Sequence, residues 1–435
     1  MYVENEISIY DFVCAISEAV DLVSPVLNDH HKRVAYISCC IAQEMNLKNN
    51  EIHDIVMAAM LHDIGAFSIN ERIKCLAFEL DNAERNNHAL TGYMLLKDFA
   101  PLSCAATLIK YHHRNYSSVT PEVPLGSYII HLADRVSVLF KENREPLEQV
   151  PQVLKQINEK KHLFHPDVID AFARVAEVEY HWIEAFSRLT SCAMSKKTSF
   201  PHEAVELVTL RDFAKMFAQI IDFRSRFTAT HSSGVAAVAL ELSAISGFSE
   251  RECKLMEIAG FLHDLGKLSV PSSILEKPGA LDFEEFVFIK KHTYYTYSIL
   301  SNISGMEHVA AWAAHHHERQ DGGGYPFRVK GFEFYKLSRI MAVADIMTAL
   351  MEDRPYRAGM SEDKAREVLL SMAESGGVDK NIAMMANENF GILNEARLLA
   401  QHVAKNEYEE FYNASALNAI TEKRKLSRRF RRLST

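Results

Sequence analysis

The sequence predicts an all-α protein built of two tandem helical bundles. Apolar residues recur at helical spacing over long stretches of the 435-residue chain, and strict apolar–polar alternation is hard to find. Only 17 Gly and 12 Pro occur, so few positions are marked as turns. An ordered set of histidines and aspartates also occurs twice along the chain. Two bundles, each built around one copy of this set, account for these observations.

The repeated set starts in each half with a histidine that a valine follows four residues later. The tripeptide Leu-His-Asp comes next, then a single histidine, a His-His pair, and an aspartate within LADRV or VADIM. Successive gaps are 32, 26, 24 and 21 residues in the first copy and 32, 29, 24 and 28 in the second, with the last gap measured from the second histidine of the pair. Chance explains this order and spacing poorly, so we interpret the pattern as an internal duplication. The members are His30, His62, Asp63, His88, His112, His113 and Asp134 in the first copy, and His231, His263, Asp264, His292, His316, His317 and Asp345 in the second.

The duplication suggests a first domain over about residues 1–190 and a second over about residues 200–435. The intervening segment SRLTSCAMSKKTSFPHEA is polar and rich in small residues, which is typical of a linker or a helix break. In the second domain, KLMEIAGFLHDLGKL places its apolar residues on one helical face. His263 and Asp264 then lie near the end of that helix, and we expect Gly266 to terminate it.

Composition excludes several classes of protein. A net charge of −9 gives no support to DNA binding. The N-terminus lacks the pattern of a secretory signal, and no apolar window is long enough to span a bilayer. Seven scattered cysteines fit a reducing cytoplasm. The basic end KRKLSRRFRRLST is compatible with a short amphipathic helix or with a solvated tail.

The second copy offers five imidazoles and two carboxylates but no thiolate. This donor set suits a pair of divalent first-row ions such as Fe or Mn better than Ca²⁺, and it argues against a structural thiolate zinc site. Asp264 could bridge two ions because a carboxylate has two oxygens. Two such ions can clamp the attacking and leaving oxygens of a phosphoester. Lys267 could stabilise charge on the phosphate or protonate the leaving oxygen. Any single histidine of the set is more simply a structural core residue; the duplicated set favours the metal site.

The segments LHDLGK, KHT, HHERQDGGGYP and VADIMTALMEDRPYR resemble an HD-GYP phosphodiesterase domain over roughly residues 220–375. The first copy resembles the same family with the signature loop deleted. The tandem arrangement is similar to bacterial phosphodiesterases that degrade 3′,3′-cyclic GMP-AMP (cGAMP). This resemblance implies an all-α fold and metal-dependent cleavage of the 3′–5′ linkages of a cyclic dinucleotide second messenger, either cGAMP or cyclic di-GMP. It is also compatible with a cyclase-type signalling partner and with a homo-oligomer.

The resemblance also implies roles for individual residues. His231, His263 and Asp345 would hold one metal together with Asp264, which would also bind the second metal. The remaining ligands of that second metal would be His292, His316 and His317. The implied substrate contacts are Gly322, Gly323, Gly324, Tyr325, Arg354 and Arg357. The glycines would let the backbone approach a phosphate-bearing ligand, and Tyr325 would stack on a base or hydrogen-bond a phosphate. A solvated helix end is the alternative for the two arginines.

Three positions depart from the family pattern. Ser225 stands where the family often has an aspartate able to recognise a guanine edge, which disfavours strict selection of two guanines. Phe227 stands where a trinuclear subset has a glutamate ligand, which favours two metals. Thr296 replaces the glycine of the usual His-Pro-x-x-Gly. The first two departures favour cGAMP over cyclic di-GMP as the substrate.

The first copy lacks the lysine, with Ala66 in its place, and the whole glycine-rich loop. Asn143 and Pro146 replace the two arginines. We therefore interpret it as a regulatory or packing partner, in which the retained histidines either bind metal or are hydrogen-bonded relics. Two alternatives for the whole chain are a phosphohydrolase acting on other nucleotides and a non-catalytic scaffold that binds a nucleotide or a signalling partner.

Overall fold

The computed structural model describes residues 7–21, 29–66, 82–118, 123–141, 144–187, 190, 194, 197, 205–223, 228–277, 279–330, 335–353 and 358–433. Side chains are described for the same residues except 82–86, 118, 272 and 414–433. Every regular element in these ranges is a helix, so the predicted all-α class is confirmed. No helix in the described part of the chain is both long enough and apolar enough to cross a bilayer.

Backbone contacts divide the chain into two compact units. The first unit contains Phe12–His202 and Asn413–Thr435, and the second contains Met1–Asp11 and Glu203–Tyr412. Each unit carries one copy of the repeated histidine and aspartate set. One backbone hydrogen bond joins the N-terminal segment to the rest of the second unit: the N–H of Val205 donates to the carbonyl of Ile7 at 3.1 Å.

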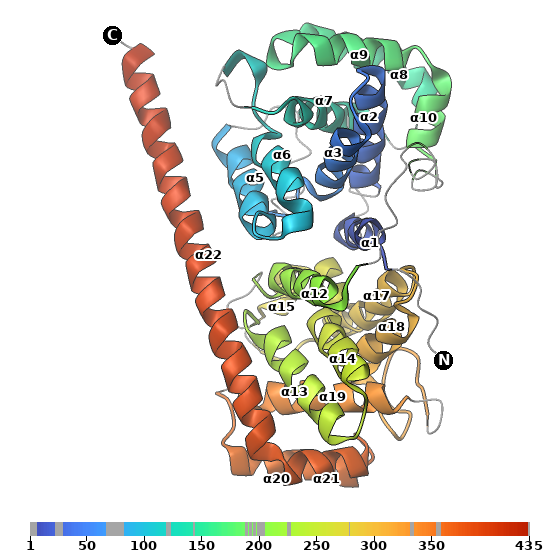
Figure 1. Ribbon diagram of the computed structural model, residues 1–435, viewed down its shortest axis with the longest axis vertical. Coiled ribbons are helices and arrows are strands. Elements are labelled where there is room, and N and C mark those ends of the chain that lie inside the picture. The colour runs from blue at the N-terminus through green and yellow to red at the C-terminus, as the bar shows by residue number, and fades with distance from the viewer. Residues whose placement is uncertain are drawn as a thin grey trace. The chain divides into compact units, whose positions relative to one another are not determined.

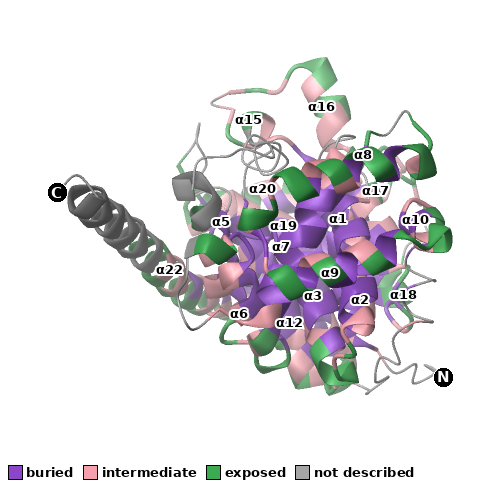
Figure 2. Ribbon diagram, turned by 90° about the horizontal axis from the view of Figure 1, so that it is seen from above, coloured by how far each residue is buried: buried purple, intermediate pink, exposed green. Residues whose placement is uncertain are grey.

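The first unit is organised around α2, which packs against α3, α7 and α9 (Figure 1). α6 packs against α3 and α5. In Figure 2, α9 turns exposed residues outward, while Val168, Phe172 and Val175 on its other face are buried. The described helices are α1 (Ile9–Asp21), α2 (His30–Glu44), α3 (Asn49–Leu61), α5 (Asn82–Leu96), η2 (Ala100–Leu102), α6 (Ser103–Tyr111), η3 (Tyr116–Ser118), α7 (Leu125–Leu139), α8 (Pro146–Glu159), η4 (Lys161–Leu163), α9 (Pro166–Ala176) and α10 (Glu179–Ala185).

The second unit is organised around α13, which packs against α14 and α19, and all three lie side by side in Figure 1. α17 packs against α18 and η5, and α19 against η6. The described helices are α12 (Leu207–Asp222), α13 (His231–Ile245), α14 (Glu250–Leu262), η5 (Leu265–Ser269), α15 (Ser272–Leu275), α16 (Phe283–Ile289), α17 (Lys291–Leu300), α18 (Glu307–Ala314), η6 (His315–His317), α19 (Lys336–Met351), α20 (Glu362–Glu374), α21 (Lys380–Glu388) and α22 (Phe390–Leu433), whose residues from Asn413 onward belong to the first unit.

Helix α14 shows how local sequence sets up the site. Ser249 begins it with a capping box, in which its hydroxyl accepts from the backbone N–H of Glu252 and the Glu252 carboxylate accepts from the backbone N–H of Ser249. The apolar face predicted from the sequence is buried at Ile258 and Leu262, whereas Leu255 is half-buried. The helix ends at Leu262, so the His-Asp pair follows directly after its last turn.

Gly266 does not terminate α14, because the helix ends four residues earlier and Gly266 lies inside η5. The glycine is required by packing. A Cβ atom at this position would lie 1.9 Å from the backbone oxygen of His292. The first unit repeats the arrangement, since a Cβ atom at Gly65 would lie 2.2 Å from the backbone oxygen of His88. Both copies thus use a glycine to bring the turn after Leu-His-Asp against the helix that carries the next histidine.

We expect Gly266→Ala to destabilise the second unit by about 1–3 kcal/mol, because overpacking against backbone forces a shift. The midpoint of thermal unfolding, followed by circular dichroism, should fall by several degrees. Gly391→Ala is the matched control, because nothing lies within 4 Å of a Cβ atom there and alanine favours a helix. Equal midpoints for the two variants would contradict the packing argument.

Candidate metal centre

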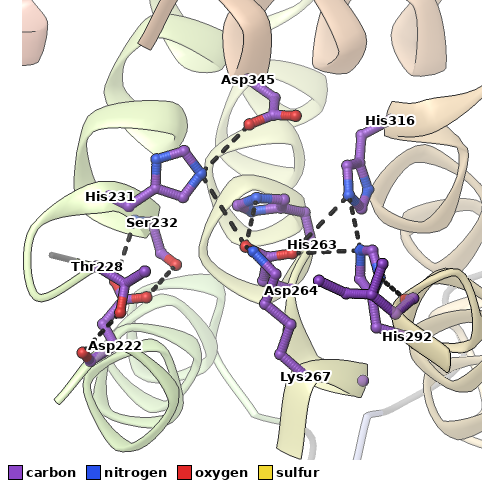
Figure 3. Close-up of polar contacts among 12 residues, drawn as sticks. Asp222, Thr228, His231, Ser232, His263, Asp264, Lys267, His292, His316 and Asp345 are labelled. Carbon is purple, nitrogen blue, oxygen red and sulfur yellow. Dashed lines mark hydrogen bonds and ion pairs between the residues drawn. The ribbon is translucent and has the colours of Figure 1, made fainter. Parts of the chain in front are cut away.

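Seven buried or half-buried side chains of the second unit lie close together, and Figure 3 labels all of them except His317. They come from separate elements that the packing of α13, α14, α17 and α19 brings together. His231 is the first residue of α13, His263 and Asp264 follow α14, His292 lies in α17, His316 and His317 form the end of η6, and Asp345 lies in α19.

Asp264 lies between two groups of imidazoles. Its Oδ2 atom is 3.2 Å from Nε2 of His263 and 4.0 Å from Nε2 of His231. Its Oδ1 atom is 3.5 Å from Nε2 of His292 and 3.8 Å from Nε2 of His316. The ligand atoms of His231, His263 and Asp264 form one group within 4.8 Å of one another, and those of His292, His316 and His317 form a second. The structure therefore brings together all seven residues of the second copy.

Backbone carbonyl groups hold most of these imidazoles in one orientation. In His263, His292 and His316, the Nδ1 atom lies 2.7, 2.5 and 2.7 Å from the carbonyl oxygen three residues earlier. An Nδ1–H that donates to this carbonyl leaves the Nε2 lone pair directed at Asp264. Oδ1 of Asp264 is buried and has no hydrogen-bond partner among the described residues. A buried acceptor of this kind, surrounded by imidazole nitrogens, fits a metal ion.

The charges of the donors also fit a cation. Burial lowers the pKa of His292 to about 3 and that of His317 to about 4, so both imidazoles are neutral at pH 7. Burial alone would raise the pKa of Asp264, but His263 and Lys267 hold it well below its usual range. The pKa of Asp345 also lies well below its usual range: burial would raise it, but the hydrogen bond from His231 lowers it. His292 and His317 therefore present neutral imidazoles, and Asp264 and Asp345 present ionised carboxylates, which are the protonation states that metal binding needs.

Lys267 lies on η5 with its Nζ atom 2.5 Å from Oδ2 of Asp264. Its side chain is 18% exposed, so the ammonium group reaches both the buried carboxylate and the surface of the site.

His231 is held by a carboxylate in place of a carbonyl, which the sequence analysis missed. Its Nδ1 atom lies 2.8 Å from Oε2 of Glu352, and its Nε2 atom lies 3.2 Å from Oδ1 of Asp345. The amide of Gln401 donates to Glu352, and Arg397 donates to Gln401 at 2.6 Å. Glu352 stands in the segment MEDRPYR, but no local pattern indicates that residues of α22 reach it.

Asp222 fixes the start of α13 and was also missed. Its carboxylate accepts from the backbone N–H and from the hydroxyl of Ser232, both at 3.0 Å (Figure 3). The hydroxyl of Thr228 donates to its backbone oxygen at 3.0 Å. Because His231 precedes Ser232, these bonds place the first imidazole of the cluster.

Thr296 has a structural role that the family comparison left unexplained. Its buried hydroxyl accepts from the backbone N–H of Gly266 at 2.9 Å and donates to the carbonyl of His263 at 3.0 Å. α17 is thereby joined to the turn that carries Asp264. Gly92 stands at the corresponding place in the first copy, four residues after His88.

The glycine-rich loop is shaped mainly by its own packing. Gly322 has a φ of 75°, which favours glycine. A Cβ atom at Gly324 would lie 2.5 Å from Cα of Glu318. The buried carboxylate of Glu318 accepts from three successive backbone N–H groups, those of residues 327, 328 and 329, at 2.7–3.1 Å. Backbone conformation and packing therefore explain Gly322 and Gly324, and no bound ligand is needed to account for them. Contact of these glycines with the substrate stays a prediction.

An aromatic and basic group leads outward from the cluster. The ring of Tyr325 lies 5.0 Å from that of His317 and 6.1 Å from that of Phe286. Nζ of Lys290 lies 4.5 Å from the Phe286 ring and 5.4 Å from the Tyr325 ring. Phe286 is 42% exposed. Phe286 and Lys290 were not predicted, since one exposed phenylalanine and one lysine carry no signal in a sequence.

Several predicted positions cannot be placed. Ser225, Phe227, Arg354, Arg357 and Asn143 lie outside the described residues.

A family model described as HD domain matches residues 215–382, and a second with the same description matches residues 28–139. The chain contains two HD domains. The first HD domain falls within the first unit and the second within the second unit, where it includes all seven donors.

Three relatives and one solved structure resemble the tandem HD chain. It is 28% identical over 393 residues to 3′3′-cGAMP-specific phosphodiesterase 1 of Vibrio cholerae, a match that covers 85% of this chain and 89% of the relative. It is 25% identical to 3′3′-cGAMP-specific phosphodiesterase 3 of the same organism, over 84% and 91% of the two chains. The cyclic di-GMP phosphodiesterase response regulator RpfG of Xanthomonas campestris pv. campestris is 36% identical over 157 residues, which cover 36% of this chain and 42% of that protein.

The crystal structure of a cyclic GMP-AMP-specific phosphodiesterase of V. cholerae, V-cGAP3, superposes with a TM-score of 0.62 at 23% identity. The match covers 86% of this chain and 96% of that one. This likeness shows a shared fold.

We expect Glu352→Ala to weaken metal binding by the second HD domain by about 10–100-fold, because the substitution removes the group that orients His231. Titration with Mn²⁺, followed by calorimetry, measures the affinity. Glu374→Ala is the control, since Glu374 is exposed and pairs only loosely with Lys380, at 3.4 Å. Equal affinities for the two variants would show that Glu352 does not act through the imidazole.

Proposed function

We propose that the chain is a metal-dependent phosphodiesterase that hydrolyses the 3′–5′ linkage of a cyclic dinucleotide. The observation that carries this proposal is the carboxylate of Asp264, which lies between two groups of imidazoles with the ammonium group of Lys267 against it. The relatives named for this reaction, which cover most of the chain, support it.

The proposed cofactor is a pair of divalent first-row ions such as Fe or Mn. His231, His263 and Asp345 would hold one ion and His292, His316 and His317 the other, with Asp264 shared. Nitrogen and oxygen donors without sulfur suit these ions. When bound, such a pair supplies Lewis-acid stabilisation of the charge that develops on a phosphate during hydrolysis.

The chain's own residues position the substrate and supply a proton. Lys267 is cationic and partly exposed, so it hydrogen-bonds a phosphate oxygen or donates a proton to the leaving oxygen. Tyr325 and Phe286 provide aromatic faces on which a nucleobase stacks, and Lys290 beside them attracts the second phosphate. We expect the backbone of Gly322, Gly323 and Gly324 to approach the substrate as well, and Arg354 and Arg357 to contact its bases or phosphates.

The favoured substrate is 3′,3′-cGAMP, with cyclic di-GMP as the alternative. The sequence has Ser225 where the family often has an aspartate, and a serine lacks the two oxygens with which a carboxylate accepts from N1–H and N2–H₂ of guanine; this disfavours strict selection of two guanines. Two relatives that match along most of the chain are named for cGAMP, whereas RpfG, named for cyclic di-GMP, matches over a shorter part.

We expect faster hydrolysis of cGAMP than of cyclic di-GMP when the Mn²⁺-loaded protein receives each in turn and products are separated by chromatography. Asp264→Asn should reduce both rates to background, because the shared ligand is lost. Asp363→Asn, an exposed position of α20, should leave both unchanged. Faster loss of cyclic di-GMP would overturn the substrate preference alone. No turnover of either by metal-loaded protein would favour a nucleotide-binding scaffold or a phosphohydrolase of other nucleotides.

We expect Lys267→Met to lower kcat for the preferred substrate by about 10²–10⁴-fold while the metal content per chain stays unchanged. Removal of a proton donor affects turnover but removes no metal ligand. Lys364→Met, at an exposed lysine of α20, is the matched control. A loss of metal in Lys267→Met would instead assign the lysine to the stability of the cluster.

A further inference from the structure

The first unit contains a donor cluster of its own, outside the proposed active site. Asp63, His88, His112 and His113 are all buried, and one ligand atom from each lies within 4.8 Å of the others. Asp63 follows α3, His88 lies in α5, and the pair His112 and His113 follows α6.

The distances within this cluster suit one four-coordinate ion. Nε2 of His88 lies 3.0 Å from Oδ1 of Asp63 and 3.0 Å from Nε2 of His113, and Nε2 of His112 lies 3.9 Å from Oδ1 of Asp63. Bonds of 2.0–2.1 Å to a tetrahedral ion would place neighbouring donors about 3.3–3.4 Å apart. The observed spacings lie on both sides of this value, so small movements of the side chains bring the four donors to it.

The ligand atoms are oriented as in the second unit. Nδ1 of His112 lies 2.7 Å from the carbonyl oxygen of Ile109, which leaves the Nε2 lone pair toward the cluster. That Nε2 atom is buried and has no hydrogen-bond partner within the described ranges. The two Nε2 atoms of His88 and His113 face each other, and two lone pairs so placed repel unless a proton or a cation lies between them. A metal ion satisfies all three nitrogens together.

An internal cation distinguishes this cluster from that of the second unit. Arg135, itself buried, donates to Oδ2 of Asp134 at 2.6 Å. Ile346 stands at the corresponding place in the second copy. The guanidinium group compensates Asp134, the carboxylate that would hold the other ion of a pair, whereas Asp63 is left among imidazoles. This charge distribution favours one ion at Asp63 over two.

We propose that the first unit binds one divalent first-row ion, such as Zn²⁺ or Mn²⁺, between Asp63, His88, His112 and His113, and that this ion is structural. Four buried protein ligands make a closed site with no position for a substrate. Ala66 stands where the second unit has Lys267, so the first unit also lacks the proton donor of the proposed reaction. The inference does not depend on the function proposed for the second unit.

The test counts metal in full-length protein whose second cluster is disabled by the double substitution Asp264→Asn, His316→Gln. The protein is incubated with Zn²⁺ or Mn²⁺, dialysed and analysed by mass spectrometry for metal. We expect about one ion per chain in this background and less than about a tenth of that after His112→Gln is added, since a ligand is lost. His131→Gln is the matched control, because His131 is a buried histidine beside the cluster that supplies no ligand. His113→Gln, a second ligand variant, decides the matter if His112→Gln does not fold.

The coordination is tested separately by loading the same background with Co²⁺. The intense visible absorption of four-coordinate Co²⁺ should appear in the background and in the His131→Gln variant, and should disappear in the ligand variants. A folded background protein that retains no metal would overturn the proposal, as would a ligand variant that retains the ion. Because neither readout uses hydrolysis, an inactive second unit would leave this result intact.

Discussion

An ionised carboxylate is costly to bury unless cations or hydrogen-bond donors surround it. Asp264 is such a group, and the rest of the second unit's site is arranged around it. α14 must end just before it, α17 and η6 must bring imidazoles to one of its oxygens, and α13 must bring another to the second oxygen. The ammonium group of Lys267 also contacts this carboxylate. The remaining charge of the carboxylates is what makes the cluster attractive to divalent ions.

The helix ends explain how an all-α protein builds such a site twice. The last carbonyl groups of a helix have no intrahelical donor. His62, His112, His263 and His316 each follow a helix, and each places Nδ1 2.7 Å from the carbonyl oxygen three residues earlier. The helix end therefore gains a hydrogen-bond donor, and the imidazole gains a fixed orientation. One local interaction thus gives a helix-end carbonyl group its hydrogen-bond donor and directs the imidazole Nε2 atom toward the cluster. A histidine just beyond the end of a helix is sufficient for both.

Much of this was predictable from residue order. The duplication pointed to the seven residues that the structure brings together, and helical spacing predicted the fold class, because both leave periodic traces in a sequence. The contributions of Glu352, Gln401 and Asp222 were missed because they depend on contacts between segments far apart in the chain, which follow no local pattern. Gly266 was recognised as important for the wrong reason: its role is close packing against the backbone of His292, which only three-dimensional structure reveals. The replacement at Thr296 acquired an explanation only when its two backbone partners were known.

The orientation of the imidazoles by carbonyl groups has a consequence for how the protein acquires its ions. The bonds that aim these ligands belong to the folded backbone and involve no metal, so the donor arrangement precedes loading. A metal ion would then bind to donors that the fold already holds in place, and loading would not require the helices to unfold and refold. The ion that such preformed donors would hold then depends on the free concentration of each metal, weighted by the intrinsic preference of nitrogen and oxygen donors.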